Sequence, residues 1–255
     1  PWHSPWLISQ RTLSATNGDI TGVVNATNSN VQVVAKNIGK SINGNQAYVH
    51  ITVTDGKGKT IEGNILGGTN SNIDLNEVAI ITGDVSIGTN GYFNAPLATI
   101  KGDVTISTNA QSTVNKILGK LDCAGTCETK SGIGHLKCSG HSCTVTGGGV
   151  DGNVTCENTC AIEESVQGNL NCLGQCTING NVGGKVDCSA DNVRCEISQG
   201  ECQGDMTAGA NGRIDINGIS GNLDCSKDGS SCVTNGGNVG GNFKCGNSGY
   251  CNVNG

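Results

Sequence analysis

The sequence predicts an all-β protein, a single parallel β-solenoid, on the basis of three observations. A five-residue signature recurs along the 255-residue chain: Gly, then Asn, Asp or Lys, then an apolar residue, then any residue, then Cys, as in Gly152–Cys156 and Gly221–Cys225. Its copies follow one another about every 19 residues, a spacing that indicates stacked repeats. Glycine accounts for 41 residues, and no long window keeps apolar positions at three- and four-residue spacing, so helices are disfavoured.

Each copy of the repeat predicts one coil with three short strands. In one coil, Val154 and Cys156 point to the same side because strand side chains alternate. A second strand contributes Cys160 and Ile162, and Val166 marks a third. Gly and Asn at the corners tolerate the positive φ of sharp turns. We therefore expect about 13 short coils, wound right-handed because parallel crossovers favour that hand.

Fourteen of the 15 cysteines fall into close pairs, each of which spans one corner of a coil. We predict seven intra-coil disulfides in the C-terminal half: Cys123–Cys127, Cys138–Cys143, Cys156–Cys160, Cys172–Cys176, Cys188–Cys195, Cys225–Cys232 and Cys245–Cys251. Zinc is the alternative, since paired cysteines can supply thiolates. One pair per coil gives only two ligands and His is scarce, so we predict no metal and no other cofactor. So many disulfides favour an oxidising compartment and hence a secreted, extracellular protein.

Cys202 is the unpaired cysteine, and the repeat suggests its role. It occupies the slot that Val182 and Ile219 fill in the neighbouring coils. A buried thiol behaves as a small hydrophobe, so we predict a free, buried Cys202; an intermolecular bridge or a reactive thiol is the alternative. The next coil has lost both paired cysteines, and we expect Ile214 and Ile216 to compensate by packing.

Composition divides the chain without interrupting the repeat. Residues 1–17 lack the signature and are predicted to be an N-terminal cap or assembly segment. Residues 18–119 form Cys-free coils, with the first signature copy placed at Gly18, and residues 120–255 form the Cys-rich coils. The chain starts at Pro1 rather than Met, so we expect a processed product or a fragment. No stretch approaches the roughly 20 apolar residues that span a bilayer, so we expect no membrane insertion.

Little in the sequence indicates chemistry. The net charge is −6 and only seven residues are aromatic, which gives neither a basic patch nor a stacking platform for nucleic acid. Glu163 and Glu164 are adjacent and should point apart, so they do not form a general acid/base pair. We therefore predict no catalytic residues and no enzyme activity. Asn25 and Asn153 start N-glycosylation triplets, which makes glycans possible partners.

The ends of the predicted rod indicate self-assembly. A solenoid end exposes an apolar cross-section and unpaired strand edges, which invite another chain. At the C-terminal end these include Phe243 and Val253, and the N-terminal segment carries Trp2 and Trp6. We expect the N-terminal segment of one copy to cover the C-terminal coil of the next, in a head-to-tail homopolymer. The alternative is that the segment only caps its own coil.

Two protein classes resemble the chain in architecture, without a shared specific motif. Over roughly residues 119–255 the small coils with inward cysteines resemble insect antifreeze solenoids, which array Thr-X-Thr on a flat face. Here the outward series is irregular and charged, with Asp122, Lys137 and Asp187 among its members. The Gly-Asp-Val coils, such as Gly83–Val85, are similar to those of bactofilin-type filament proteins.

These resemblances imply two functions from different classes. The sequence predicts a secreted structural protein, a rigid solenoid subunit of an extracellular filament. The alternative is a surface-binding solenoid, either ice-binding or an adhesin. A polysaccharide-acting β-helix enzyme is a third class, disfavoured because these coils are too short to carry cleft-forming loops.

Overall fold

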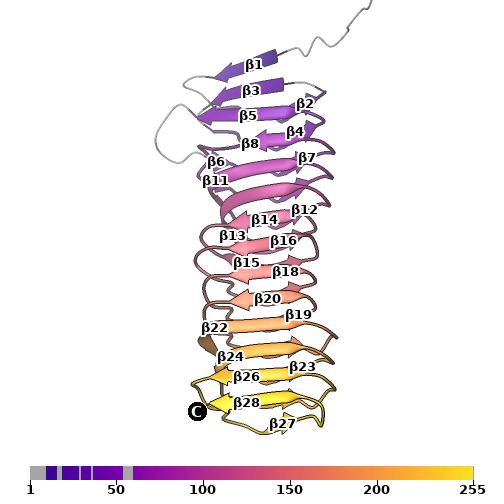
Figure 1. Ribbon diagram of the computed structural model, residues 1–255. Helices are drawn as coiled ribbons and strands as arrows, with labels where there is room; N and C mark the ends of the chain where they lie inside the picture. The colour runs from indigo at the N-terminus through magenta and orange to yellow at the C-terminus, as the bar shows by residue number, and fades with distance from the viewer. Residues whose placement is uncertain (1–9, 16–18, 29, 36, 54–59, 255) are drawn as a thin grey trace, which may run out of the picture.

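The protein is one elongated parallel β-solenoid without a helix among the residues that the structure describes (Figure 1). The computed structural model describes residues 10–15, 19–28, 30–35, 37–53 and 60–254. They form 28 strands, joined by parallel pairing throughout. The chain makes about 12 turns, close to the 13 coils expected from the repeat. The predicted fold class is confirmed.

Each turn crosses three faces of the rod. The signature face carries the strands that follow the repeated glycine. They are β2 (Val24–Thr27), β4 (Ile42–Asn45), β7 (Ile65–Gly67), β10 (Val85–Ile87), β12 (Val104–Ile106), the ends of β13 (Gln111–Cys123) and β15 (Ile133–Cys138), β17 (Val154–Cys156), β19 (Leu170–Cys172), β21 (Val186–Cys188), β23 (Met206–Ala208), β25 (Leu223–Cys225) and β27 (Phe243–Cys245).

The second face follows the signature face around one corner. It holds β1 (Gln10–Ala15), β3 (Asn30–Ala35), β5 (Tyr48–Val53), β8 (Asn72–Asp74), the starts of β11 (Tyr92–Ile100) and β13, β14 (Thr126–Thr129), β16 (Ser142–Val145), β18 (Thr159–Ile162), β20 (Gln175–Ile178), the starts of β22 (Arg194–Cys202) and β24 (Arg213–Ile219), β26 (Ser231–Asn235) and β28 (Tyr250–Asn254).

The third face is the narrowest. It consists of β6 (Thr60–Ile61), β9 (Ile80–Ile81), the ends of β11, β22 and β24, the middle of β13, the start of β15, and single-residue bridges such as Val150↔Val166 and Val166↔Val182. The predicted third strand is therefore often a single paired residue. A coil still directs five side chains inward, because each face contributes its alternate residues. In one coil these are Val154, Cys156, Cys160, Ile162 and Val166, all at most 1% exposed.

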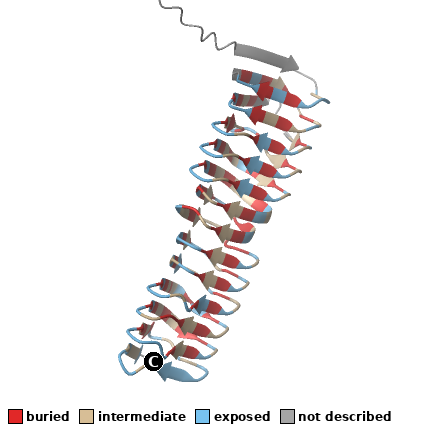
Figure 2. Cartoon of the chain, turned by 90° about the vertical axis from the view of Figure 1, so that its right-hand side faces the viewer, coloured by how far each residue is buried: buried red, intermediate tan, exposed pale blue. Residues whose placement is uncertain are grey.

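The coil is right-handed, as the sequence analysis expected. In Figure 1 the chain descends from β1 to β28 while the second-face strands point to the left across the front. Figure 2 turns the right-hand side toward the viewer, and there β27 runs toward that same front. Buried and exposed positions alternate along the strands in this view, which is the period-two pattern of a sheet with one face inward.

The first coil has a different register from the one expected. Ile20 bridges to Ile38 on the third face, whereas Val24 pairs with Ile42 on the signature face. The first signature therefore begins at Gly22, and the placement at Gly18 was wrong. The three residues from Gly18 match the start of the signature in composition. The third face also accepts a β-branched residue after polar ones, so only the strand pairing distinguishes a third-face strand from a signature strand.

The signature glycines serve close approach between coils, not positive φ. Positive φ falls on corner residues such as Asn70, Asn90 and Asn109, and on none of the signature glycines. A Cβ on Gly184 would overlap Oδ1 of Asn169, the second signature residue of the preceding coil. The positive φ expected of Gly and Asn at the corners is present at these corner asparagines and also at Gly132 and Gly148, whereas the signature glycines have a different role.

The space above each signature glycine is filled by a hydrogen bond between coils. Asn169 Oδ1 accepts the backbone N–H of Lys185 at 2.8 Å, directly over Gly184. We call this arrangement the Gly/Asn interlock: the second signature residue of one coil accepts the N–H of the second signature residue in the next. It recurs from Asn64 to Asp84, Asp84 to Asp103, Asp103 to Lys120, Asn153 to Asn169, Asp205 to Asn222 and Asn222 to Asn242. It holds successive coils in register.

Candidate functional site

Six of the seven predicted disulfides are present in the structure. They are Cys123–Cys127, Cys138–Cys143, Cys156–Cys160, Cys172–Cys176, Cys225–Cys232 and Cys245–Cys251. Their Cα atoms lie 6.0 to 6.5 Å apart, and each joins the signature face to the second face within one coil. These disulfides, the rungs of the ladder, fill the corner of the interior that other inward pairs, such as Ile87 and Phe93, fill in the Cys-free coils.

The seventh predicted disulfide, Cys188–Cys195, is not formed, because both side chains are free and buried thiols. Cys195 pairs in register with Cys176, so it occupies a rung position. The hydrogen bond with Cys195, together with burial, raises the pKa of the Cys188 thiol well above its ordinary value. The spacing in the sequence could not show whether this pair is free or bonded, since the bonded Cys225–Cys232 pair has the same separation of 7 residues.

This thiol pair is also the best candidate for a metal among the described residues. The Sγ atoms of Cys172, Cys188 and Cys195 all lie within 4.8 Å of one another. Cys172 is bonded to Cys176, however, which leaves two thiols. A structural zinc site takes four ligands, so these residues do not fit one.

Cys202 lies where the repeat places it, on the third face between Val182 and Ile219. It is a free thiol and fully buried. Burial raises the pKa of Cys202 to about 11, against an ordinary value of 9.0. Only the thiolate is a strong nucleophile, so this position is that of a core residue rather than a reactive one.

The free thiols give a direct test of the corrected pairing. After unfolding in guanidinium at pH 8 without reductant, we expect three thiols to react with a thiol-specific reagent. In the folded protein the reaction should be slow, because a pKa near 11 instead of 9.0 makes the Cys202 thiolate about 100-fold scarcer. A count of one thiol after unfolding would show that Cys188 and Cys195 close the seventh disulfide.

The last described coil, formed by β27 and β28, carries exposed apolar side chains. In β27 all three residues are exposed, whereas β25, one coil earlier, has both inward residues buried. Phe243 is 37% exposed, Val253 42% and Tyr250 61%. Figure 2 shows β27 as a fully exposed strand beside the C-terminus. Phe243 and Val253 lie here as predicted from the sequence, while Trp2 and Trp6 lie outside the described residues.

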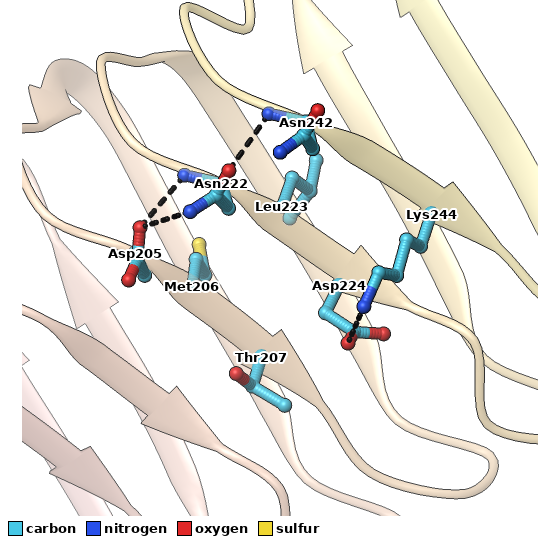
Figure 3. A pocket seen from close by; sticks show the side chains of 8 residues that line it. All are labelled: Asp205, Met206, Thr207, Asn222, Leu223, Asp224, Asn242 and Lys244. Carbon is cyan, nitrogen blue, oxygen red and sulfur yellow. Dashed lines mark hydrogen bonds and ion pairs between the residues drawn. The ribbon is translucent and has the colours of Figure 1, made fainter.

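A depression of about 270 Å³ lies on the signature face near this end (Figure 3). Its two carboxylates are already engaged. Asp205 accepts the backbone N–H of Asn222 and a hydrogen bond from its side chain, which lowers the Asp205 pKa. Asp224 accepts hydrogen bonds from the Ser226 side chain at 2.6 Å and from its N–H, and Lys244 lies 3.7 Å away, so the Asp224 pKa is also lowered. Acids held in the charged form are poor proton donors, and the arrangement is that of structural links between coils.

The two glycosylation candidates, Asn25 and Asn153, are both exposed. Asn25 is exposed, and its Oδ1 accepts a hydrogen bond from Asn43 Nδ2 at 2.7 Å. Asn153 belongs to the interlock, because its Oδ1 accepts the Asn169 N–H at 2.9 Å. An N-glycan is attached through Nδ2, so the hydrogen bonds that the two Oδ1 atoms accept do not favour one asparagine over the other.

Comparison with protein-family models, with curated proteins and with solved structures found no match. Among the described residues no helix has the length and apolar character needed to cross a membrane.

Proposed function

We propose that this chain is a secreted structural protein, a rigid solenoid subunit that assembles head-to-tail into an extracellular filament. The continuous ladder of parallel strands supports a stiff rod, and six disulfides support an oxidising compartment. The interior is filled by side chains, and the carboxylates of the surface depression serve as structural acceptors, which is in keeping with a protein that is not an enzyme.

The observation that carries the proposal is the exposed last coil. Phe243 and Val253 would be buried if one more coil were stacked on them, and each Å² of apolar surface covered contributes about 25 cal/mol. The last strands also present unpaired backbone groups to an incoming strand. A contact between opposite ends of identical chains does not close on itself, so it propagates as a fibre.

The surface-binding alternative has less support. Outward residues of the signature face stand in register, which an ice-binding or adhesive array requires. Their identities do not repeat, however: Thr105, Asp122 and Lys137 follow one another in the ladder. A flat repetitive target needs a repeated chemical group, and this face lacks one.

Electron microscopy of the native protein in negative stain tests the proposal. We expect unbranched filaments much longer than one rod, whose about 12 turns at about 4.8 Å each give a height of about 58 Å. Single rods at all concentrations, or rods that align only on a surface such as ice, would contradict it.

A further inference from the structure

The free Cys188 and Cys195 pair, which we call the open rung, lies next to a bonded pair of the disulfide ladder. It follows Cys172–Cys176 one coil later. Cys195 pairs in register with Cys176, and the register of the adjoining strands β19 and β21 places Cys188 on Cys172. The Sγ atoms of Cys172, Cys188 and Cys195 all lie within 4.8 Å of one another. Two thiols and a disulfide sulfur therefore share one small part of the interior.

A thiol close to a disulfide can exchange with it without an external oxidant, because a thiolate attacks one sulfur and releases the other through a mixed disulfide. Such a bridge needs Cα atoms about 4.4 to 6.8 Å apart. Cys188 lies one strand spacing, about 4.8 Å, from Cys172, which is inside this range. Cys195 lies diagonally from Cys172, at about 7.8 Å when that spacing is combined with the 6.2 Å between the Cα atoms of Cys172 and Cys176. Cys188 is therefore the thiol placed to bridge to Cys172.

We propose that the open rung moves along the ladder by disulfide exchange. Cys188 attacks Cys172 Sγ, the Cys172–Cys188 bond forms, and the Cys172–Cys176 bond breaks, with the Cys188 proton passing to the released sulfur. Cys195 then attacks Cys188 Sγ and releases Cys172, which takes the Cys195 proton. One disulfide and two thiols are present before and after, so there is no net oxidation or reduction. The product has a closed Cys188–Cys195 rung and an open Cys172 and Cys176 pair.

Coils without sulfur at the rung positions confine this exchange. On one side Ala208 and Ile214 follow the open rung in register, so the Cys225–Cys232 rung lies two coils away, at about 9.6 Å. On the other side the coil that precedes the first rung carries Ile106 and Ser112. Between these limits the rungs stack without interruption: Cys172–Cys176, Cys156–Cys160, Cys138–Cys143 and Cys123–Cys127. The open rung can therefore move toward Cys123 and not toward Cys225.

The exchange is slow in the folded protein and is sealed from solution. The hydrogen bond with Cys195 and burial raise the pKa of the Cys188 thiol well above its ordinary value, so the attacking thiolate is scarce. Disulfide rearrangement without a catalyst takes minutes to hours even for accessible groups. The four cysteines of the two rungs are at most 1% exposed, which keeps external thiols and oxidants away. We therefore expect exchange between neighbouring rungs over hours or longer.

Thiol mapping over time tests the movement. The folded, full-length protein is held at pH 8 without reductant, and samples are then unfolded in acidic guanidinium with a maleimide present, because protonated thiols do not exchange. Peptide mapping should find label in the Cys172–Cys176 rung as well as in the open rung. Cys202 should be labelled throughout and serves as the internal reference, while the Cys225–Cys232 rung should stay unlabelled.

The other possible labelling patterns would overturn the proposal. Label confined at all times to Cys188, Cys195 and Cys202 would show that the open rung is fixed. Label in the Cys225–Cys232 rung as well would show general scrambling rather than exchange between stacked neighbours. Label on Cys202 alone would show that all seven pairs are bonded and that there is no open rung.

A variant that lacks the second thiol should trap the exchange halfway. Cys195→Ile copies Ile214, the residue that the next coil carries at this position, so the packed interior is retained. With the second step removed, a fraction of the chains should hold a Cys172–Cys188 disulfide between coils, with Cys176 free and labelled. This disulfide is identified directly by mass spectrometry of the unreduced peptides.

The matched control removes the attacking thiol instead. Cys188→Ala copies Ala208, the residue at the same position of the next coil. The Cys172–Cys176 rung should then stay bonded and unlabelled, although Cys195 is still present. Equal labelling of Cys176 in the two variants would overturn the assignment of Cys188 as the attacking thiol.

Discussion

Replacing Gly184 by alanine should lower the free energy of unfolding by about 3 kcal/mol or more, the range of severe single substitutions. The new Cβ would overlap Asn169 Oδ1 and come within 2.8 Å of the carbonyl carbon and oxygen of Gly168. The Asn169 side chain can rotate away, but that breaks its hydrogen bond to the Lys185 N–H. The Gly168 backbone cannot give way without shifting a coil that is paired on both sides.

A matched glycine separates this steric effect from a general effect of alanine. Gly218 lies in β24 without a positive φ, and the atoms nearest to a Cβ there belong to the flexible Glu201 side chain, at 3.3 Å or more. Gly218→Ala should be neutral or stabilising by up to about 1 kcal/mol, because alanine restricts the unfolded chain. Guanidinium unfolding of both variants makes the comparison, and equal midpoints would contradict the close-approach role of the signature glycine.

The periodic pattern made the architecture predictable. The alternation at Val154 and Cys156 predicted which side chains point inward. The return of the signature predicted the length of each coil and the corners that the cysteine pairs span. The interlock was not predictable, because Asn169 and Gly184 lie in neighbouring coils. Their contact depends on the distance between those coils, which a residue pattern does not give. The sequence suggested that glycine provides conformational freedom. At the signature positions the structure shows that the missing side chain leaves space for the preceding coil.

The candidate site was predictable only in part. Pair spacing identified the rungs, yet it could not distinguish the closed Cys225–Cys232 rung from the open Cys188 and Cys195 pair. The apolar character of Phe243 and Val253 indicated an open end.

The second large effect is expected at the Cys225–Cys232 rung. The double substitution Cys225→Ala/Cys232→Ala should cost about 4 kcal/mol. Loss of the cross-link in a loop of this length removes roughly 2.5 kcal/mol on the chain-entropy model. The remaining 1 to 2 kcal/mol, roughly, comes from the cavity that two truncated side chains leave in a packed interior.

The neighbouring coil supplies a matched control for that cavity. Ala208 and Ile214 occupy its rung position, and both are fully buried. Copying this pair, as Cys225→Ala/Cys232→Ile, should restore the packing and leave only the loss of the cross-link, about 2.5 kcal/mol. The difference between the two double variants in guanidinium unfolding therefore measures the space-filling role of the rung alone. If the Ala/Ile variant is no more stable than the Ala/Ala variant, the disulfide ladder acts only as a set of cross-links, and an apolar pair is not its equivalent in the core.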